Sequence, residues 1–283
     1  MTARVDADFL GAAVAELARR DGDFARMVAR HGHPALRVEP GGFSALLRII
    51  VEQQLSVASA AAIWGRVESA MAEATPRAFL ALDDAALRAC GLSRPKIAYG
   101  RSLAGTVLAG TLDVDGLVHM DDEAAIAALV QIKGIGRWTA EIYLLSALAR
   151  PDIWPAGDLA VATAAGHLKG MKRRPSEDEL RAMGEAWRPF RAVAARLLWH
   201  FFRGEKLRPL APPLAKRRRA KTKGKAKTKA KTKGKTKVKI RAAAKFRTKA
   251  KSRKVQTKPG RTRAKTARAA SKKRKSTRRG ARR

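Results

Sequence analysis

The residues best suited to chemistry begin in a short glycine turn at residues 131–140, with the sequence Gln-Ile-Lys-Gly-Ile-Gly-Arg-Trp-Thr-Ala. Gly134 and Gly136 lie between two segments whose apolar residues have helical spacing. Glycine permits a positive φ and the close approach of another backbone, and the N–H groups that open the second helix can bind a phosphate oxygen. By itself, such a turn favours an ordinary corner between two helices.

A single acidic residue, Asp158, follows 22 residues after Gly136. It directly precedes a helical pattern that begins at Leu159, so its side chain can cap that helix. The N-terminus of a helix favours a negative charge, and an ionised carboxylate can stabilise positive charge in a transition state or activate water. Capping and catalysis are therefore compatible interpretations of this residue.

The elements that must position these residues have helical spacing almost everywhere before Pro209. Ser176 and Glu179 predict a capping box at the start of one of the helices. Only residues 111–114 indicate a strand, and weakly. The sequence thus predicts one all-α domain at 1–208 and a proline-containing linker at 209–215. The helical stretches are residues 10–17, 46–51, 57–71, 79–82, 87–90, 97–107, 124–130, 138–150, 176–187 and 193–201.

The positive charge is concentrated in the last quarter of the chain. Residues 216–283 contain 34 Lys or Arg and no acidic residue, which leaves 27 basic and 24 acidic residues in 1–215. Such a segment cannot bury enough apolar surface to fold by itself, so we expect a disordered tail that binds a polyanion. We favour non-specific binding to nucleic acid, although ribosomal RNA or an acidic membrane surface would satisfy the same charges.

Composition excludes several other classes of function. The single cysteine, Cys90, excludes a disulfide framework and a thiolate-bound metal or iron–sulfur cluster, and the five scattered histidines do not suggest zinc. No signal peptide or long apolar segment is visible, so we expect a cytoplasmic protein that does not enter a membrane.

Several motifs occur together in a recognisable order. They are residues 50–56 (Ile-Val-Glu-Gln-Gln-Leu-Ser), 90–93 with Lys96, the glycine turn, 154–161 around Asp158, and 187–191. Together they resemble the helix-hairpin-helix superfamily of DNA glycosylases, and within it the 3-methyladenine (alkylbase) DNA glycosylase II branch, over most of residues 43–202. The resemblance implies a helix-hairpin-helix glycosylase bundle with a cleft.

The resemblance also implies an activity. Asp158 matches the catalytic aspartate, which would support hydrolysis of the N-glycosidic bond of an alkylated purine such as 3-methyladenine in base excision repair. Trp138 stands where strand-cutting relatives have a nucleophilic lysine, so the expected enzyme is monofunctional and has no lyase activity. The implied partner is double-stranded DNA with a damaged base that is flipped out. We expect a nucleoid-associated monomer that requires no cofactor.

The remaining site residues are carried over from the same family. Trp138 and Trp187 match aromatic residues of the base pocket, although either could simply pack in the core. Gln54, with Leu55 beside it, matches the wedge that enters the minor groove, although a polar helix end bonding locally is an equal alternative. The phosphate-binding residues would be Lys133, Gly134, Gly136 and Thr139, and a structural monovalent cation would bind the backbone carbonyls of Val130, Ile132 and Ile135.

Two other functions stay open at this point. An inactive hairpin domain could coat DNA together with the tail, and an active glycosylase could prefer another lesion, such as a deaminated or etheno base. Lys133 also replaces the proline that is common before the first glycine of this turn.

Overall fold

The computed structural model describes residues 4–208 and 210–213. All of the described residues belong to one of the two units into which the chain divides. The predicted tail at 216–283 lies outside the described residues, as do residues 209, 214 and 215 of the predicted linker.

The described residues form helices and contain no strand, which confirms the all-α prediction. Residues 111–114 form a turn and irregular chain, and α2 and η1 are helices that the apolar spacing did not predict. The elements are α1 (Ala7–Arg20), α2 (Gly22–His31), α3 (Gly42–Glu52), α4 (Val57–Met71), α5 (Pro76–Ala81), α6 (Asp84–Ala89), α7 (Arg94–Leu108), η1 (Gly116–His119), α8 (Asp122–Leu129), α9 (Arg137–Ser146), α10 (Leu159–Leu168), α11 (Glu177–Glu185) and α12 (Arg191–Glu205).

Most of these helices begin where a short polar side chain can accept a backbone N–H. Ser56 caps α4, and Ser176 and Glu179 form the predicted capping box at the start of α11. Asp158 caps α10 by accepting the N–H of Val161 at 2.8 Å. Local sequence therefore determines several helix starts, including that of the helix behind the candidate catalytic residue.

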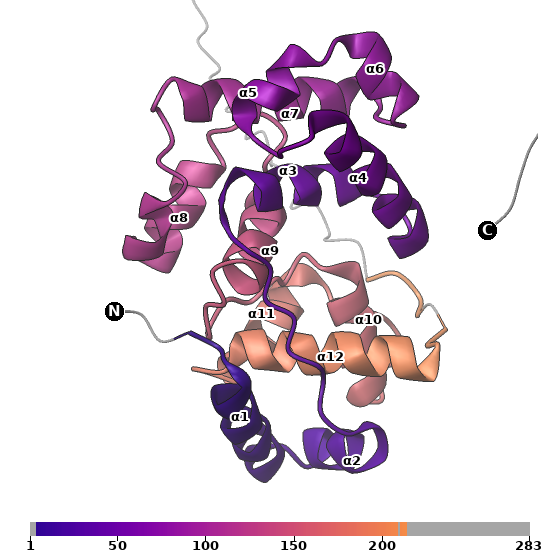
Figure 1. Cartoon of the computed structure of the whole chain (residues 1–283). Helices are drawn as coiled ribbons and strands as arrows, with labels where there is room; N and C mark the ends of the chain where they lie inside the picture. Colours follow the sequence, from indigo (N-terminus) through magenta and orange to yellow (C-terminus); the bar gives the residue numbers. More distant parts are fainter. Residues whose placement is uncertain (1–3, 209, 214–283) are drawn as a thin grey trace, which may run out of the picture. The chain divides into compact units, whose positions relative to one another are not determined.

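The helices pack in two groups within this unit (Figure 1). In one group α3 contacts α4, α7 and α9, and α8 packs on α9; in the other α12 contacts α1, α2 and α10. Residues 32–41 connect α2 of the second group to α3 of the first. The buried apolar faces, such as Leu46, Leu47 and Ile50 on α3 and Leu197 and Leu198 on α12, form one continuous core.

Part of the predicted linker packs onto the helices. A Cβ at Gly166 of α10 would lie 2.6 Å from Cδ1 of Leu210, so glycine leaves the space that this leucine fills. The N–H of Arg174 donates to the carbonyl of Ala211 at 2.9 Å. None of the helices in the described residues is long and apolar enough to cross a membrane.

Candidate active site and DNA interface

The predicted hairpin joins α8 to α9 through residues 130–136. Gly134 has a φ of +91°, and a Cβ there would lie 2.1 Å from Cγ of Tyr99 on α7. A side chain at this position would therefore be both strained and in collision with an aromatic ring. Ile132 and Ile135 are buried on either side and fix the turn to the core.

The outer face of the hairpin remains accessible. Lys133 and Gly136 are exposed, and Gly136 begins α9 without a side-chain cap, so the first N–H groups of that helix have no capping side chain. Thr139 differs from the expectation, because its side chain is buried and its hydroxyl accepts a bond from Gln53. Any contact of Thr139 with a phosphate would therefore use its backbone N–H.

Gln53 ties the end of α3 to the hairpin. Its Nε2 donates to the carbonyl of Gly134 at 3.1 Å and to Oγ1 of Thr139 at 3.0 Å. On the other side, Nζ of Lys96 donates to the carbonyls of Val51 and Gln53, each at 2.7 Å, and burial lowers the pKa of Lys96. The sequence motif contained both residues, but only the fold shows what they bind.

The predicted wedge residues follow directly after this junction. Gln54 is exposed in a left-handed conformation with a φ of +57°, and Leu55 is exposed beside it. Val57, which opens α4, is 85% exposed. Leu55 and Val57 both line the pocket that contains Asp158. The exposed apolar side chains of Leu55 and Val57 therefore lie at that pocket, next to the exposed Gln54.

Asp158 lies at this pocket and is only 8% exposed. Its Oδ2 accepts Nε1–H of Trp138 at 3.0 Å, and its Oδ1 accepts Nε1–H of Trp199 at 3.1 Å as well as the N–H of Val161. Two indoles from α9 and α12 thus orient a carboxylate that the start of α10 presents. The pocket has a volume of about 450 Å³, which is within the range of small-molecule sites.

Trp187 is placed elsewhere, and this part of the pocket prediction is corrected. Its side chain is 2% exposed, its Nε1–H donates to Oδ2 of Asp21 at 3.1 Å, and its ring packs edge-on against Phe24 and Trp154. Trp187 therefore belongs to the core of the second helix group. Trp199, and not Trp187, lines the pocket together with Trp138.

A signal for Trp199 was present in the sequence. The apolar face of α12 is formed by Val193, Leu197 and Leu198, and Trp199 lies off that face. Arg196, Trp199 and Arg203 follow one another at intervals of three and four residues, so they share another face of the helix. A tryptophan between two arginines on one face of a helix indicates a functional surface.

The carbonyls proposed for a monovalent cation lie in the hairpin turn. The carbonyl of Ile132 accepts the N–H of Ile135 at 3.0 Å, which leaves it one further lone pair. Val130 is the C-cap residue of α8. Elsewhere in residues 4–208 and 210–213, no cluster of His, Cys, Asp or Glu could hold a metal ion.

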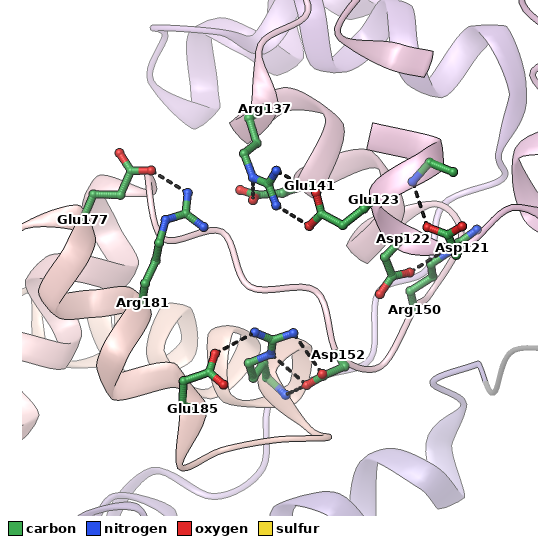
Figure 2. A network of polar contacts seen from close by, with 12 residues as sticks. Asp121, Asp122, Glu123, Arg137, Glu141, Arg150, Asp152, Glu177, Arg181 and Glu185 are labelled. Atoms are coloured by element: carbon green, nitrogen blue, oxygen red, sulfur yellow. Dashed lines mark hydrogen bonds and ion pairs between the residues drawn. The ribbon is translucent and has the colours of Figure 1, made fainter. Parts of the chain in front are cut away.

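Charged side chains around Arg137 and Glu141 of α9 form a network of ion pairs (Figure 2), and several of them line a second cavity of about 360 Å³. Arg137 pairs there with Glu123 at 2.5 Å and with Glu141 at 2.8 Å. The bond to Glu123 is the main reason that the pKa of Arg137 is raised, while burial raises that of Glu141. The guanidinium thus ties the two arms of the hairpin together instead of facing the pocket of Asp158.

Comparison with known proteins agrees with this geometry. Residues 47–189 match the family described as HhH-GPD superfamily base excision DNA repair protein, and the chain belongs to that superfamily. This confirms the family resemblance.

The similar proteins include several alkylbase glycosylases. The chain is 34% identical over 161 residues to DNA-3-methyladenine glycosylase 1 of Schizosaccharomyces pombe, covering 56% of this chain and 71% of the relative. It is 30% identical over 181 residues to DNA-3-methyladenine glycosylase 2 of Escherichia coli, covering 59% and 61%. The structure of the S. pombe enzyme in complex with abasic DNA aligns with a TM-score of 0.64 and 32% identity, over 69% of this chain and 97% of that one.

Proposed function

We propose that this protein is a DNA glycosylase that hydrolyses the N-glycosidic bond of alkylated purines, such as 3-methyladenine, and thereby starts base excision repair. The observation that carries the proposal is the carboxylate of Asp158 at a pocket of about 450 Å³, oriented by the indoles of Trp138 and Trp199. The similar proteins with this fold act on 3-methyladenine by name.

Asp158 would act on the sugar of the flipped nucleotide. Departure of the base builds positive charge on the sugar, and a nearby carboxylate stabilises that transition state or activates the attacking water. A purine alkylated at N3 or N7, such as 3-methyladenine, is already cationic in DNA, so it leaves without prior protonation. This chemistry matches a pocket whose acidic residue is fixed by hydrogen bonds before the substrate arrives.

The two pocket indoles would contribute to selectivity. Their N–H groups are used by Asp158, so what they can offer a base is their aromatic surface. A cation near an indole face gains roughly 0.5–2 kcal/mol per ring. That accounts for about tenfold discrimination per ring, and the weakened glycosidic bond and easier flipping of the damaged base would supply the rest.

Hydrolysis without strand cleavage is part of the proposal. Trp138 occupies the hairpin position of the lysine nucleophile in lyase-active relatives, and the described residues lining the pocket include no lysine. Without an amine near the sugar, no Schiff base can form. Borohydride should therefore trap no covalent complex between the protein and damaged DNA.

The DNA-binding parts of the proposal follow from the same geometry. Lys133 and the N–H groups around Gly134 and Gly136 would bind a phosphate, and Gln54 with Leu55 would fill the gap left by the flipped base. The basic tail would add non-specific affinity for nucleic acid, and the protein would act as a nucleoid-associated monomer.

The test of the catalytic assignment is Asp158→Asn. Asparagine keeps one oxygen, which can still cap α10 and accept Nε1–H of Trp199, but its amide nitrogen cannot accept Nε1–H of Trp138. The variant therefore loses the negative charge and one hydrogen bond, while the cap that starts α10 is kept. We expect release of 3-methyladenine from methylated DNA to fall by roughly a hundredfold or more. Binding to duplex DNA with an abasic-site analogue should change little.

The controls separate this proposal from its alternatives. Unchanged base release by Asp158→Asn would remove Asp158 from the mechanism. A wild-type protein that binds abasic DNA but releases no base from DNA with methylated, deaminated or etheno bases would be a DNA-coating protein. Release of only deaminated or etheno bases would keep the mechanism and change the substrate.

A further inference from the structure

One face of α12 lines the pocket of Asp158 with an alternation of cationic and aromatic side chains. Arg196, Trp199 and Arg203 all line the pocket, and their spacing of three and four residues places them along a single stripe. Arg196 is buried, Trp199 is half-buried on Asp158, and Arg203 is exposed. The stripe therefore runs from the interior to the solvent as α12 approaches its C-terminus.

Arg196 fixes a second segment against this stripe. Its Nη1 donates to the carbonyl of Arg37 at 3.0 Å and its Nη2 to the carbonyl of Leu145 at 2.8 Å, while its Nε is buried without a partner. Burial lowers the pKa of this arginine. Residues 32–41 are thereby held across the pocket wall, and the exposed side chain of Arg37 also lines the pocket.

Arg37 and Arg203 differ from Arg48, a half-buried arginine that lines the same pocket. Arg48 is neutralised by Glu39 at 3.1 Å and by Glu52 at 2.9 Å. Neither Arg37 nor Arg203 has an acidic partner among the residues that the structure describes, and the pKa of Arg203 is lowered by burial and by the positive charge of Arg37. Two neighbouring like charges at the rim of a pocket repel each other unless an anion binds between or beside them.

We propose that Arg37 and Arg203 form a second phosphate-binding site, which holds the DNA backbone next to the flipped nucleotide. The guanidinium fork matches the geometry of a phosphodiester, and both side chains stand at the pocket that would receive the base. The hairpin belongs to the first helix group, whereas α12 belongs to the second. Both helix groups would thus bind the DNA strand, one on either side of the base pocket.

This inference rests on the proposed function for the identity of the pocket's ligand, and a charge-neutralisation experiment tests it. Binding is measured to duplexes that carry a tetrahydrofuran abasic-site analogue, with each phosphate flanking it replaced in turn by an uncharged methylphosphonate. For the wild type, we expect one such replacement to weaken binding about tenfold, because a charge-assisted contact is lost. In the double variant Arg37→Gln/Arg203→Gln, the same replacement should change binding less than twofold.

Arg19→Gln is the matched control. Arg19 is an exposed arginine on α1 that pairs with Glu16 and does not line the pocket, and its loss removes the same charge as either test substitution. This control should keep the tenfold sensitivity of the wild type. The double variant should also lose about 0.9 in the slope of log affinity against log salt for each phosphate contact that it no longer makes.

Two results would overturn the inference: a double variant as sensitive as the wild type at every flanking phosphate, or a wild type that is insensitive at all of them. Melting temperatures, which should be unchanged for these exposed residues, exclude unfolding as a cause. Base release from methylated DNA is measured on the same samples. Absence of release by the wild type would refute the proposed function. The comparison of wild type and double variant on the methylphosphonate duplexes would still show whether the two arginines bind a phosphate.

Discussion

In the described part of the chain, two carboxylates accept hydrogen bonds from tryptophan indoles, and they differ in what else binds them. Asp21, which is partly buried beside the core of the second helix group, accepts Nε1–H of Trp187 and also Nζ of Lys169 at 2.8 Å. Asp158 accepts Trp138, Trp199 and a backbone N–H, and it has no cationic partner among residues 4–208 and 210–213. Neutral donors orient a carboxylate without cancelling its charge.

This difference in hydrogen-bond partners explains why Asp21 and Asp158, which both accept indole N–H groups, have different roles. Burial opposes ionisation of Asp21, but the bonds from Lys169 and Trp187 outweigh it and lower the pKa of its carboxyl. Its charge is therefore matched inside the protein and stabilises the fold. Three neutral N–H donors orient the carboxylate of Asp158 at the pocket. Its charge can act there on a cation that arrives with the substrate.

Among the variants that test this comparison, the largest effect is expected from giving Asp158 a cationic partner, as Asp21 already has. Trp199→Arg would place a guanidinium beside the carboxylate, and arginine cannot form a Schiff base. We expect base release to fall roughly a hundredfold, because the transition-state charge would meet a neutralised carboxylate. Single-turnover rates on methylated DNA measure this.

Trp199→Phe provides the reference for that variant. Phenylalanine keeps an aromatic surface and loses the N–H bond to Asp158, so the rate should fall about tenfold. Equal rates for the Arg and Phe variants would show that the net charge at Asp158 is unimportant.

A smaller effect, on stability alone, is expected from Trp187→Phe. The variant loses the indole bond to Asp21 and leaves space beside Phe24 and Trp154, which should cost about 1–3 kcal/mol of unfolding free energy. Urea unfolding measures the loss. The base-release rate of the folded protein should stay within twofold of the wild-type rate. A stable but inactive Trp187→Phe variant would instead show that Trp187 acts in the base pocket.

The smallest effect is the pH dependence of stability that Asp21 contributes. Because its pKa is lowered on folding, its ionisation adds stability above the unfolded pKa, about 3.9, and that stability disappears as the pH falls through the lower folded value. Between pH 5 and pH 3 the melting temperature of Asp21→Asn should therefore fall less steeply than that of the wild type. A parallel fall in both proteins would contradict the pairing.

Local patterns were sufficient for much of the fold. The glycine turn, the cap at Asp158 and the capping box at Ser176 depend on residues within a few positions of one another, and short-range geometry determines them. Helical spacing predicted most of the helices but missed α2. Phe24, Met27 and Val28 of α2 do have the i, i+3, i+4 spacing of one helix face, but they are the only large apolar residues among its ten.

The sequence by itself determined that the part of the chain before Pro209 is helical, that a glycine turn precedes a helix, and that an aspartate caps a later one. Only the tertiary structure decided which tryptophan meets that aspartate, that Gln53 binds the turn 81 residues away, and that Arg137 is neutralised. The physical reason is that Trp187 and Trp199 are both compatible with their local helical patterns. Which of them is buried in the core and which lies on the pocket depends on how α12 packs against α9 and α10, and spacing along the chain contains no record of that packing.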